Sequence, residues 1–124
     1  MIYLDTHVVV WLYAGEVEKL STKVCNLINE HEIYISPIVR LELQYLYEIQ
    51  RVTERVNEIV ADLSDRIGLK IGDDSFNKIV GSTLDLSWTR DPFDRIIVAN
   101  AALNSSTLLT KDQNILENYE RATW

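Results

Sequence analysis

Short apolar runs alternate with amphipathic segments along this chain of 124 residues. The apolar runs and the last four residues predict five strands, at residues 2–5, 33–35, 69–71, 107–110 and 121–124. Apolar residues at helical spacing predict helices at residues 7–13, 22–31, 37–50, 54–66, 75–84 and 92–103. Strands that alternate with helices are joined by right-handed crossovers, which produce a parallel sheet with helices on both faces. The sequence therefore predicts a single α/β domain over residues 1–124, with three α/β/α layers and a central parallel sheet of four to five strands.

Capping residues mark where several of these helices begin. Ser36-Pro37 and Asp91-Pro92 each place a capping side chain before a proline at the first helical position, where the missing N–H is not needed. Ser21 is a predicted cap of the same kind, and Asp74-Ser75 is expected to cap the helix at 75–84.

Composition excludes several classes of protein. No run of about 18 apolar residues is present and the N-terminus lacks the basic region of a signal peptide, so we expect a cytoplasmic protein without a membrane span. A single cysteine, Cys25, excludes an internal disulfide and a cysteine-based metal cluster. The net charge of −7 disfavours binding of nucleic acid by charge alone. A bound divalent cation would reverse the local sign of charge.

Four acidic residues lie where a purely structural role is hard to assign. Asp5 ends the first predicted strand and Asp112 follows the fourth, so the two share one rim of the sheet if these strands are adjacent. Glu42 lies about 200° around its helix from Arg40, on the side away from the polar face. Asp94 is followed at helical spacing by apolar residues only. A carboxylate in an apolar stripe is costly unless it is paired, protonated or coordinated.

Each of these acids also has a structural interpretation. Asp5 and Asp112 are candidate caps of the segments that follow them, and Asp94 is a candidate for assisting the cap before its helix. Glu42 would need an ion pair with a basic residue. Asp91 is better explained as a cap than as a ligand, so it is assigned at most a supporting role.

Carboxylates that converge repel one another and raise one another's pKa unless a cation binds between them. Oxygen ligands without histidine or cysteine favour Mg²⁺, with Mn²⁺ as a substitute, over zinc. Ions held in this way activate water and stabilise the leaving oxygen of a phosphodiester. Thr6 and Thr110 are candidate supporting residues that orient the ligands or their waters, although ordinary hydrogen bonds to the backbone explain them equally well.

The segments IYLDTHVVVWLY, ISPIVRLELQYL, RDPFDRIIVANA and LLTKD together resemble the PIN domain family. More narrowly, they resemble the VapC-type toxin ribonucleases of VapBC toxin–antitoxin modules. The resemblance covers nearly the whole chain, in the expected order, and Asn100 stands where members often carry alanine.

This resemblance implies a PIN-like fold and a Mg²⁺-dependent endoribonuclease, the toxin component of a type II toxin–antitoxin system. It places the catalytic and metal-binding acids at Asp5, Glu42, Asp94 and Asp112. It also implies a homodimer and a cognate VapB-type antitoxin whose C-terminal segment covers the acidic site.

Several basic and aromatic residues remain. Candidate contacts to RNA phosphates are Arg90, Arg95, Arg40 and Lys111, although a solvated rim explains them equally well. His7 and His31 are not expected to be catalysts, because metal-dependent hydrolysis of this kind needs no imidazole. Aromatic and apolar residues expected in the core or in a partner groove are Trp11, Tyr45, Leu46 and Tyr47.

Three alternative functions stay open at this level. A receiver-type signalling domain also has acidic ligands at strand ends, and Lys111 would be its lysine. It would need an adjacent acidic pair after the first strand, which this sequence lacks. A catalytically silent PIN-like interaction module is the second alternative, and a metal-dependent nuclease that acts on DNA is the third.

Overall fold

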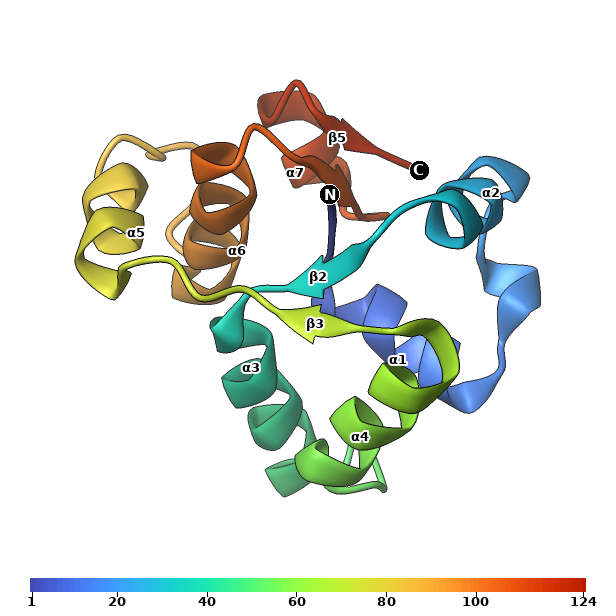
Figure 1. Cartoon of the computed structure of the whole chain (residues 1–124). Coiled ribbons are helices and arrows are strands. Elements are labelled where there is room, and N and C mark those ends of the chain that lie inside the picture. Colours follow the sequence, from blue (N-terminus) through green and yellow to red (C-terminus); the bar gives the residue numbers. More distant parts are fainter.

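The computed structural model describes all 124 residues and is built around one parallel sheet (Figure 1). The sheet has five strands in the order β3-β2-β1-β4-β5. The strands are β1 (Ile2–Leu4), β2 (Ile33–Ile35), β3 (Lys70–Ile71), β4 (Thr107–Leu109) and β5 (Ala122–Thr123). Every neighbouring pair is parallel, as the alternating pattern predicts. A receiver-type domain has the strand order 2-1-3-4-5, so this order excludes that alternative.

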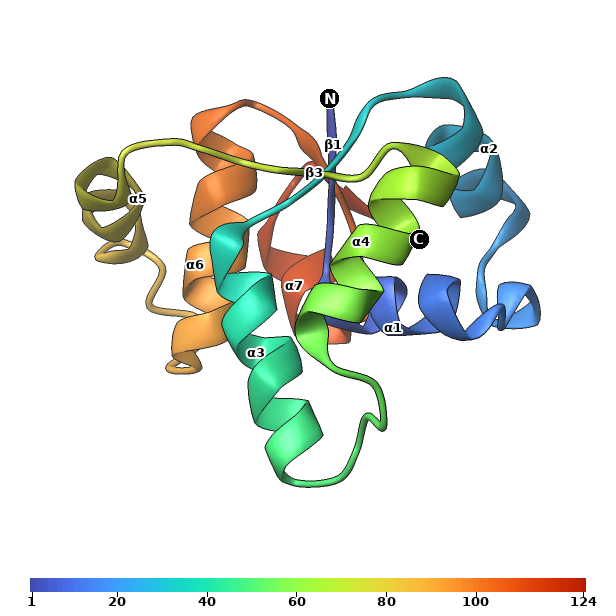
Figure 2. The ribbon, with the colours of Figure 1, turned by 60° about the horizontal axis from the view of Figure 1, so that its bottom comes forward.

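Helices cover both faces of the sheet. They are α1 (Thr6–Ala14), α2 (Thr22–Glu30), α3 (Pro37–Glu48), α4 (Val56–Ile67), α5 (Phe76–Thr83), α6 (Pro92–Leu103) and α7 (Gln113–Asn118). In Figure 1, α6 lies to the left of the strands and α2 to the right, whereas α3 and α4 lie below β3. Figure 2 shows α3 running between α6 and α4 on the outside of the molecule. The three-layer α/β/α prediction is confirmed.

The predicted caps place most of these helices correctly. The side chains of Ser21, Ser36 and Asp91 each accept a hydrogen bond from a backbone N–H of the first turn that follows. Gly15 and Gly68 end α1 and α4 in the left-handed conformation, which costs a glycine little. Element ends differ from the predictions by a few residues, as expected from fraying. A short 3₁₀ helix, Val17–Lys19, lies in a segment for which no element was predicted.

The prediction for Asp74 is wrong. Ser75 alone caps α5, through a hydrogen bond from the backbone N–H of Lys78. The Asp74 carboxylate instead accepts hydrogen bonds from the side-chain amides of Asn100 and Asn104, at 3.0 and 2.9 Å. Asp74 therefore ties the loop before α5 to the helix α6, and it satisfies the buried side-chain amide of Asn100.

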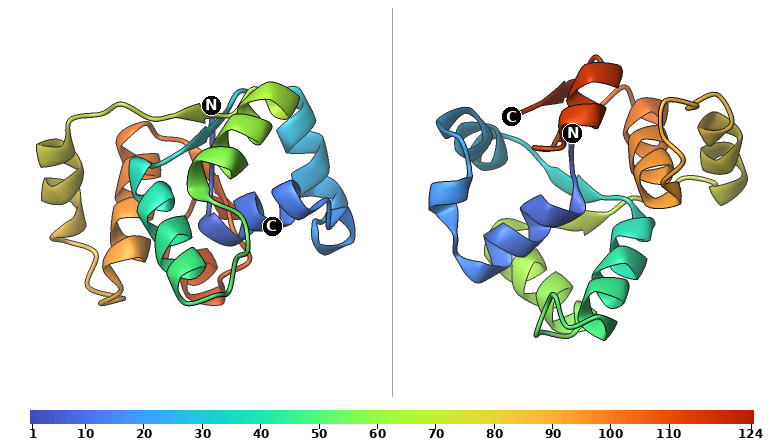
Figure 3. Two further views of the ribbon diagram at one scale, coloured as in Figure 1. Left: turned by 90° about the horizontal axis from the view of Figure 1, so that it is seen from below. Right: turned by 180° about the vertical axis from the view of Figure 1, so that it is seen from behind.

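The core fills the space between the sheet and its helices. A continuous cluster of 22 buried apolar residues includes all three residues of β1, and Leu4 in that strand is fully buried. Figure 3 shows both ends of the chain, which lie close to the sheet. The side chain of Trp124 packs against the core cluster. No helix is long and apolar enough to cross a membrane.

The order of the strands fixes where a ligand can bind. From β1 the chain crosses to β2 and β3 on one side of the sheet, and β4 and β5 lie on the other side of β1. The crossover direction thus reverses between β1 and β4, and ligands bind in such folds beyond the carboxyl ends of the strands at that point. Asp5 directly follows β1, and its backbone N–H donates to the carbonyl of Leu109, the last residue of β4, at 3.0 Å.

Candidate active site

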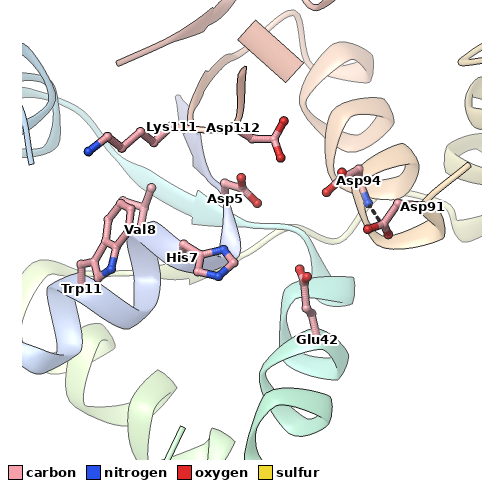
Figure 4. A pocket seen from close by; sticks show the side chains of 9 residues that line it. All are labelled: Asp5, His7, Val8, Trp11, Glu42, Asp91, Asp94, Lys111 and Asp112. Atoms are coloured by element: carbon pink, nitrogen blue, oxygen red, sulfur yellow. Dashed lines mark hydrogen bonds between the residues drawn. The ribbon is translucent and has the colours of Figure 1, made fainter. Parts of the chain in front are cut away.

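A pocket of about 360 Å³ opens beyond the carboxyl ends of β1 and β4 (Figure 4). Its lining residues are Asp5, His7, Val8, Trp11, Glu42, Asp91, Asp94, Lys111 and Asp112. All four acids that the sequence predicts as ligands are among them. In Figure 4 their carboxylates point toward a common space, from β1, α3, α6 and the segment after β4. Residues up to 107 positions apart in the sequence thus meet at one rim of the sheet.

Asp5 is the most buried of these acids, with 7% of its surface exposed. One carboxylate oxygen, Oδ1, accepts a hydrogen bond from the backbone N–H of Thr6 at 2.8 Å, which caps α1. The other oxygen, Oδ2, accepts one from the Thr110 hydroxyl at 2.6 Å. The capping role and the position in the pocket are therefore compatible, and both interpretations of Asp5 apply.

Thr110 joins Asp5 to Asp112. Its hydroxyl donates to Asp5 and accepts a hydrogen bond from the backbone N–H of Asp112 at 3.0 Å. Asp112 in turn caps α7 with Oδ1, which accepts from the backbone N–H of Ile115 at 3.0 Å. Since that cap uses one oxygen, Oδ2 of Asp112 stays available to the pocket.

Thr6 joins the same site to α3. Its hydroxyl donates a hydrogen bond to Oε1 of Glu42, and Thr6 itself is fully buried at the start of α1. Glu42 is half-buried in the middle of α3. Its predicted position away from the polar face is confirmed, and its hydrogen-bond partner is a hydroxyl, not a basic residue. A chain of contacts thus runs from Asp112 through Thr110, Asp5 and Thr6 to Glu42.

Asp94 differs from the other three acids. It lies in the first turn of α6, half-buried, and the structure contains no hydrogen bond to its carboxylate. The neighbouring Asp91 caps that helix, and its Oδ1 accepts from the backbone N–H groups of Phe93 and Asp94 at 2.8 and 3.4 Å. Asp91 therefore has a structural role, as the sequence predicts, although it also borders the pocket.

The pKa values of the acids reflect burial and mutual repulsion. Burial raises the pKa of Asp94 to about 7, with the nearby charge of Asp91 the next cause. Burial also raises the pKa of Glu42 and of Asp5, and hydrogen bonds from Thr6 and Thr110 work against it. A protein that keeps carboxylates in such an environment loses stability at neutral pH unless a cation compensates.

The donor set fits a hard divalent cation. The four predicted ligands all offer carboxylate oxygens, the donor type that suits Mg²⁺ or Mn²⁺. No three of the His, Cys, Asp and Glu side chains are close enough together to complete a metal site by themselves. Mg²⁺ keeps several of its waters and binds directly to only one or two carboxylates in many sites, so the remaining acids can contact the ion through water. The unpartnered carboxylate of Asp94 is the observation that fits a cation best.

The predicted RNA contacts are less well placed. Arg40, Arg90 and Arg95 do not line the pocket, whereas Lys111 does. Nε of Arg95 donates to the carbonyl of Thr89 at 2.7 Å, so this side chain holds the loop before α6. Contact of these arginines with RNA outside the pocket stays a prediction.

Sequence reasoning missed three residues of the pocket wall, all of them on α1. His7, Val8 and Trp11 line the pocket, and His7 and Trp11 come from consecutive turns of the helix. The spacing of four residues between His7 and Trp11 contained the signal, because residues four apart share one face of a helix. Trp11 was expected in the core or in a partner groove, since the segment is apolar almost throughout, and His7 was not expected to be a catalyst.

Comparisons with known proteins identify the family and the fold of this chain. The sequence profile described as PIN domain matches residues 2–121. Curated protein sequences give no significant match. Among solved structures, VapBC2 from Rickettsia felis bound to a promoter DNA fragment is 24% identical, with a TM-score of 0.70 over 94% of this chain and 92% of that one.

Two further structures have a similar fold. A toxin–antitoxin complex from Klebsiella pneumoniae is 17% identical, with a TM-score of 0.72 over 100% of this chain and 97% of that one. VapBC-1 from nontypeable Haemophilus influenzae is 16% identical, with a TM-score of 0.62 over 98% of this chain and 92% of that one. At such identities the likeness demonstrates the fold, and the profile match demonstrates the family. This chain belongs to the PIN domain family, and its α/β structure is a PIN-like fold.

Proposed function

We propose that this protein is a Mg²⁺-dependent endoribonuclease, the VapC-type toxin component of a type II toxin–antitoxin system. The observation that carries the proposal is the meeting of Asp5, Glu42, Asp94 and Asp112 around one pocket, where Asp94 has no partner within the chain. Family membership supports nuclease activity, and the three similar structures support a toxin–antitoxin context. Mn²⁺ is expected to substitute for Mg²⁺.

The four acids share one task in this proposal. Asp5, Glu42, Asp94 and Asp112 would hold the metal ion or its waters, and the bound ion would supply an activated water and neutralise charge on the phosphate. Thr110 and Thr6 are positioning residues, because their hydroxyls fix the orientation of Asp5 and Glu42. Asp91 fixes the first turn of α6 and thereby the position of Asp94.

The partners follow from the same proposal. The similar structures are described as VapBC or toxin–antitoxin complexes, so a VapB-type antitoxin is the expected protein partner of this chain. An RNA substrate is favoured over DNA only by the likeness to VapC toxins. A catalytically silent interaction module is disfavoured, because all four acids are present and share one pocket.

A homodimer is supported by an exposed apolar stripe on α3. Leu41, Tyr45 and Ile49 are spaced four residues apart and are 57, 50 and 44% exposed. The Tyr45 ring packs against Phe93 of α6 at 6.2 Å between centroids, which extends the stripe toward α6. Contiguous apolar surface of this kind is typical of an interface. We propose that a second copy of this chain covers it.

Cleavage of a structured RNA by the purified chain tests the function. The reaction is run with Mg²⁺, with Mn²⁺ and with a chelator, beside the Asp5→Asn variant prepared in the same way. Cleavage that needs metal and is absent from the variant is the expected result, and a DNA of the same sequence should stay intact. Equal cleavage by wild type and variant would trace the activity to a contaminant and contradict the proposal.

A further inference from the structure

The pocket extends beyond its acids. His7, Val8 and Trp11 come from α1, and Lys111 comes from the segment that follows β4. In Figure 4 the Lys111 side chain extends away from Asp112, toward the side of the pocket where Trp11 lies. Trp11 and Lys111 thus lie on the side of the pocket away from Asp94, and His7 lies between Trp11 and Glu42. The proposed metal chemistry makes no use of Trp11, Lys111 or His7.

Trp11 is held in place by its neighbours. The ring of Trp124 meets the indole edge-on, with 5.7 Å between centroids and an interplanar angle of 69°. Nζ of Lys19 lies 5.8 Å from the indole centroid. Trp11 stays partly exposed, and the exposed ring of His7 lies 6.1 Å from it. Trp11 is therefore preorganised for contact with a ligand, which lowers the entropic cost of binding. The rings of Trp11 and His7 together are named here the aromatic wall.

Charge alone cannot hold an RNA in this pocket. Five carboxylates line it, beside the single ammonium group of Lys111, and the whole chain carries a net charge of −7. A bound cation would compensate the negative charge only of the acids next to it. Stacking of a base on an aromatic ring does not depend on net charge and contributes about 1–3 kcal/mol per base. The aromatic wall offers the attraction that the electrostatics of this chain do not provide.

We propose that the aromatic wall stacks against an unpaired base of the RNA next to the scissile phosphate, and that Lys111 contacts the adjoining phosphate. The inference rests on the proposed nuclease function and adds a specificity-determining residue, Trp11, to it. A base inside a duplex is already stacked on its neighbours and does not reach a protein ring. The wall therefore selects loops and single-stranded segments of RNA.

Binding of two short RNA probes tests the stacking contact apart from catalysis. The Asp94→Asn chain serves as the host, since it keeps the aromatic wall and is expected not to cut. Its affinity for fluorescein-labelled octauridylate is compared with that for an eight-residue ribose phosphate chain without bases. Adding Trp11→Leu should weaken octauridylate binding by about 5- to 100-fold and leave binding of the abasic chain unchanged. Trp11→Phe should keep most of the affinity, because a phenyl ring also stacks.

Two further variants separate stacking from folding. His7→Ala alters an exposed side chain and should weaken octauridylate binding several-fold without changing the circular dichroism spectrum. Trp88→Phe alters a tryptophan outside the pocket and should leave affinity unchanged. If Trp11→Leu weakened the affinity for both probes equally, Trp11 would only support the fold. If Trp11→Leu left the affinity for octauridylate unchanged, no base would stack there. Either result overturns the inference.

The same variants distinguish failure of this inference from failure of the proposed function. If the wild-type chain cuts RNA with Mg²⁺ and Trp11→Leu binds octauridylate normally, the nuclease proposal stands and the aromatic wall fails. If Trp11→Leu weakens the affinity for octauridylate but not for the abasic chain, and the wild-type chain cuts no RNA, the aromatic wall stands as a binding site for unpaired bases. The nuclease proposal then fails.

Discussion

The Thr110 hydroxyl donates a hydrogen bond of 2.6 Å to Asp5 while accepting one of 3.0 Å from the backbone N–H of Asp112. Thr110 is fully buried, and its hydrogen bond to Asp5 connects the carboxyl ends of the adjacent parallel strands β1 and β4. One hydroxyl thus fixes two of the four acids at the switch point of the sheet. The relationship explains why a threonine stands between β4 and its acid, where a purely apolar residue would also fill the core.

Replacing Thr110 with valine should separate positioning from packing. The variant keeps the shape of the side chain but removes the donor to Asp5, so RNA cleavage should fall by about 10- to 100-fold. Unfolding in urea should show a loss of about 1–2 kcal/mol, since a buried acceptor loses its partner. Thr110→Ser restores the hydroxyl and should restore most of the activity. An active Thr110→Val chain would show that Asp5 needs no fixed orientation.

The two acids at the start of α6, Asp91 and Asp94, should respond differently to substitution by asparagine. Asp94→Asn should abolish cleavage while the fold persists, because it removes a proposed metal ligand without touching a hydrogen bond of the chain. Asp91→Asn should retain most activity, since asparagine caps a helix as well as aspartate does. Cleavage assays with circular dichroism spectra check both. The assignment of Asp94 as the ligand would be wrong if Asp91→Asn were inactive and Asp94→Asn active.

The metal-free protein should lose stability as the pH rises from 5 to 7.5. Asp94 has a pKa of about 7 in the folded chain, raised from its ordinary value of 3.8. Between these values the folded state binds a proton that the unfolded state has lost, so its contribution to stability is present at low pH and disappears as the pH passes 7. Because the side chain is partly solvated, we expect a loss of about 1–2 kcal/mol.

Urea unfolding in the presence of a chelator measures this pH dependence. Asp94→Asn should flatten it, and Mg²⁺ should restore stability to the wild-type chain at pH 7.5 by binding the folded state. The raised pKa values of Asp5 and Glu42 act in the same direction, so some dependence should remain in the variant. A wild-type chain that is more stable at pH 7.5 than at pH 5 without metal would contradict the prediction.

The apolar stripe on α3 should control association. Leu41→Asp places a charge on a side chain that is 57% exposed, so it should leave the fold of one chain intact and weaken a dimer formed through this stripe. Sedimentation at several concentrations should give the mass of a dimer for the wild type and of one chain for the variant. Arg40→Asp, a neighbouring exposed position on the polar face of the same helix, is the matched control and should stay dimeric.

Much of this structure follows from local sequence signals. Apolar runs of three or four residues between capped helices predict the parallel sheet, because such alternation leaves few other topologies. Ser21, Ser36 and Asp91 mark helix starts through contacts within one turn, which are visible in the sequence. The placement of Asp5 and Asp112 on one rim followed from the same reasoning, since each ends or follows a strand.

Other features depend on contacts between distant segments, which no local pattern records. The position of Asp74 next to Ser75 predicted a helix cap that it does not form. Its carboxylate instead accepts hydrogen bonds from Asn100 and Asn104, which are 26 and 30 residues away in the sequence. The hydrogen bond from Thr6 to Glu42 spans 36 residues and the one from Thr110 to Asp5 spans 105. Trp11 was expected in the core or in a partner groove; it packs against the core cluster and also borders the pocket.

The sequence by itself thus determined the elements, their order and the residue types that a metal-dependent nuclease needs, because helix caps and strand periodicity act over a few residues. Only the tertiary structure decided that four acids from β1, α3, α6 and the end of β4 share one pocket, and that the Asp94 carboxylate lacks a partner there. The physical reason is that burial and repulsion depend on which strands lie side by side, and the packing of the whole sheet sets that order.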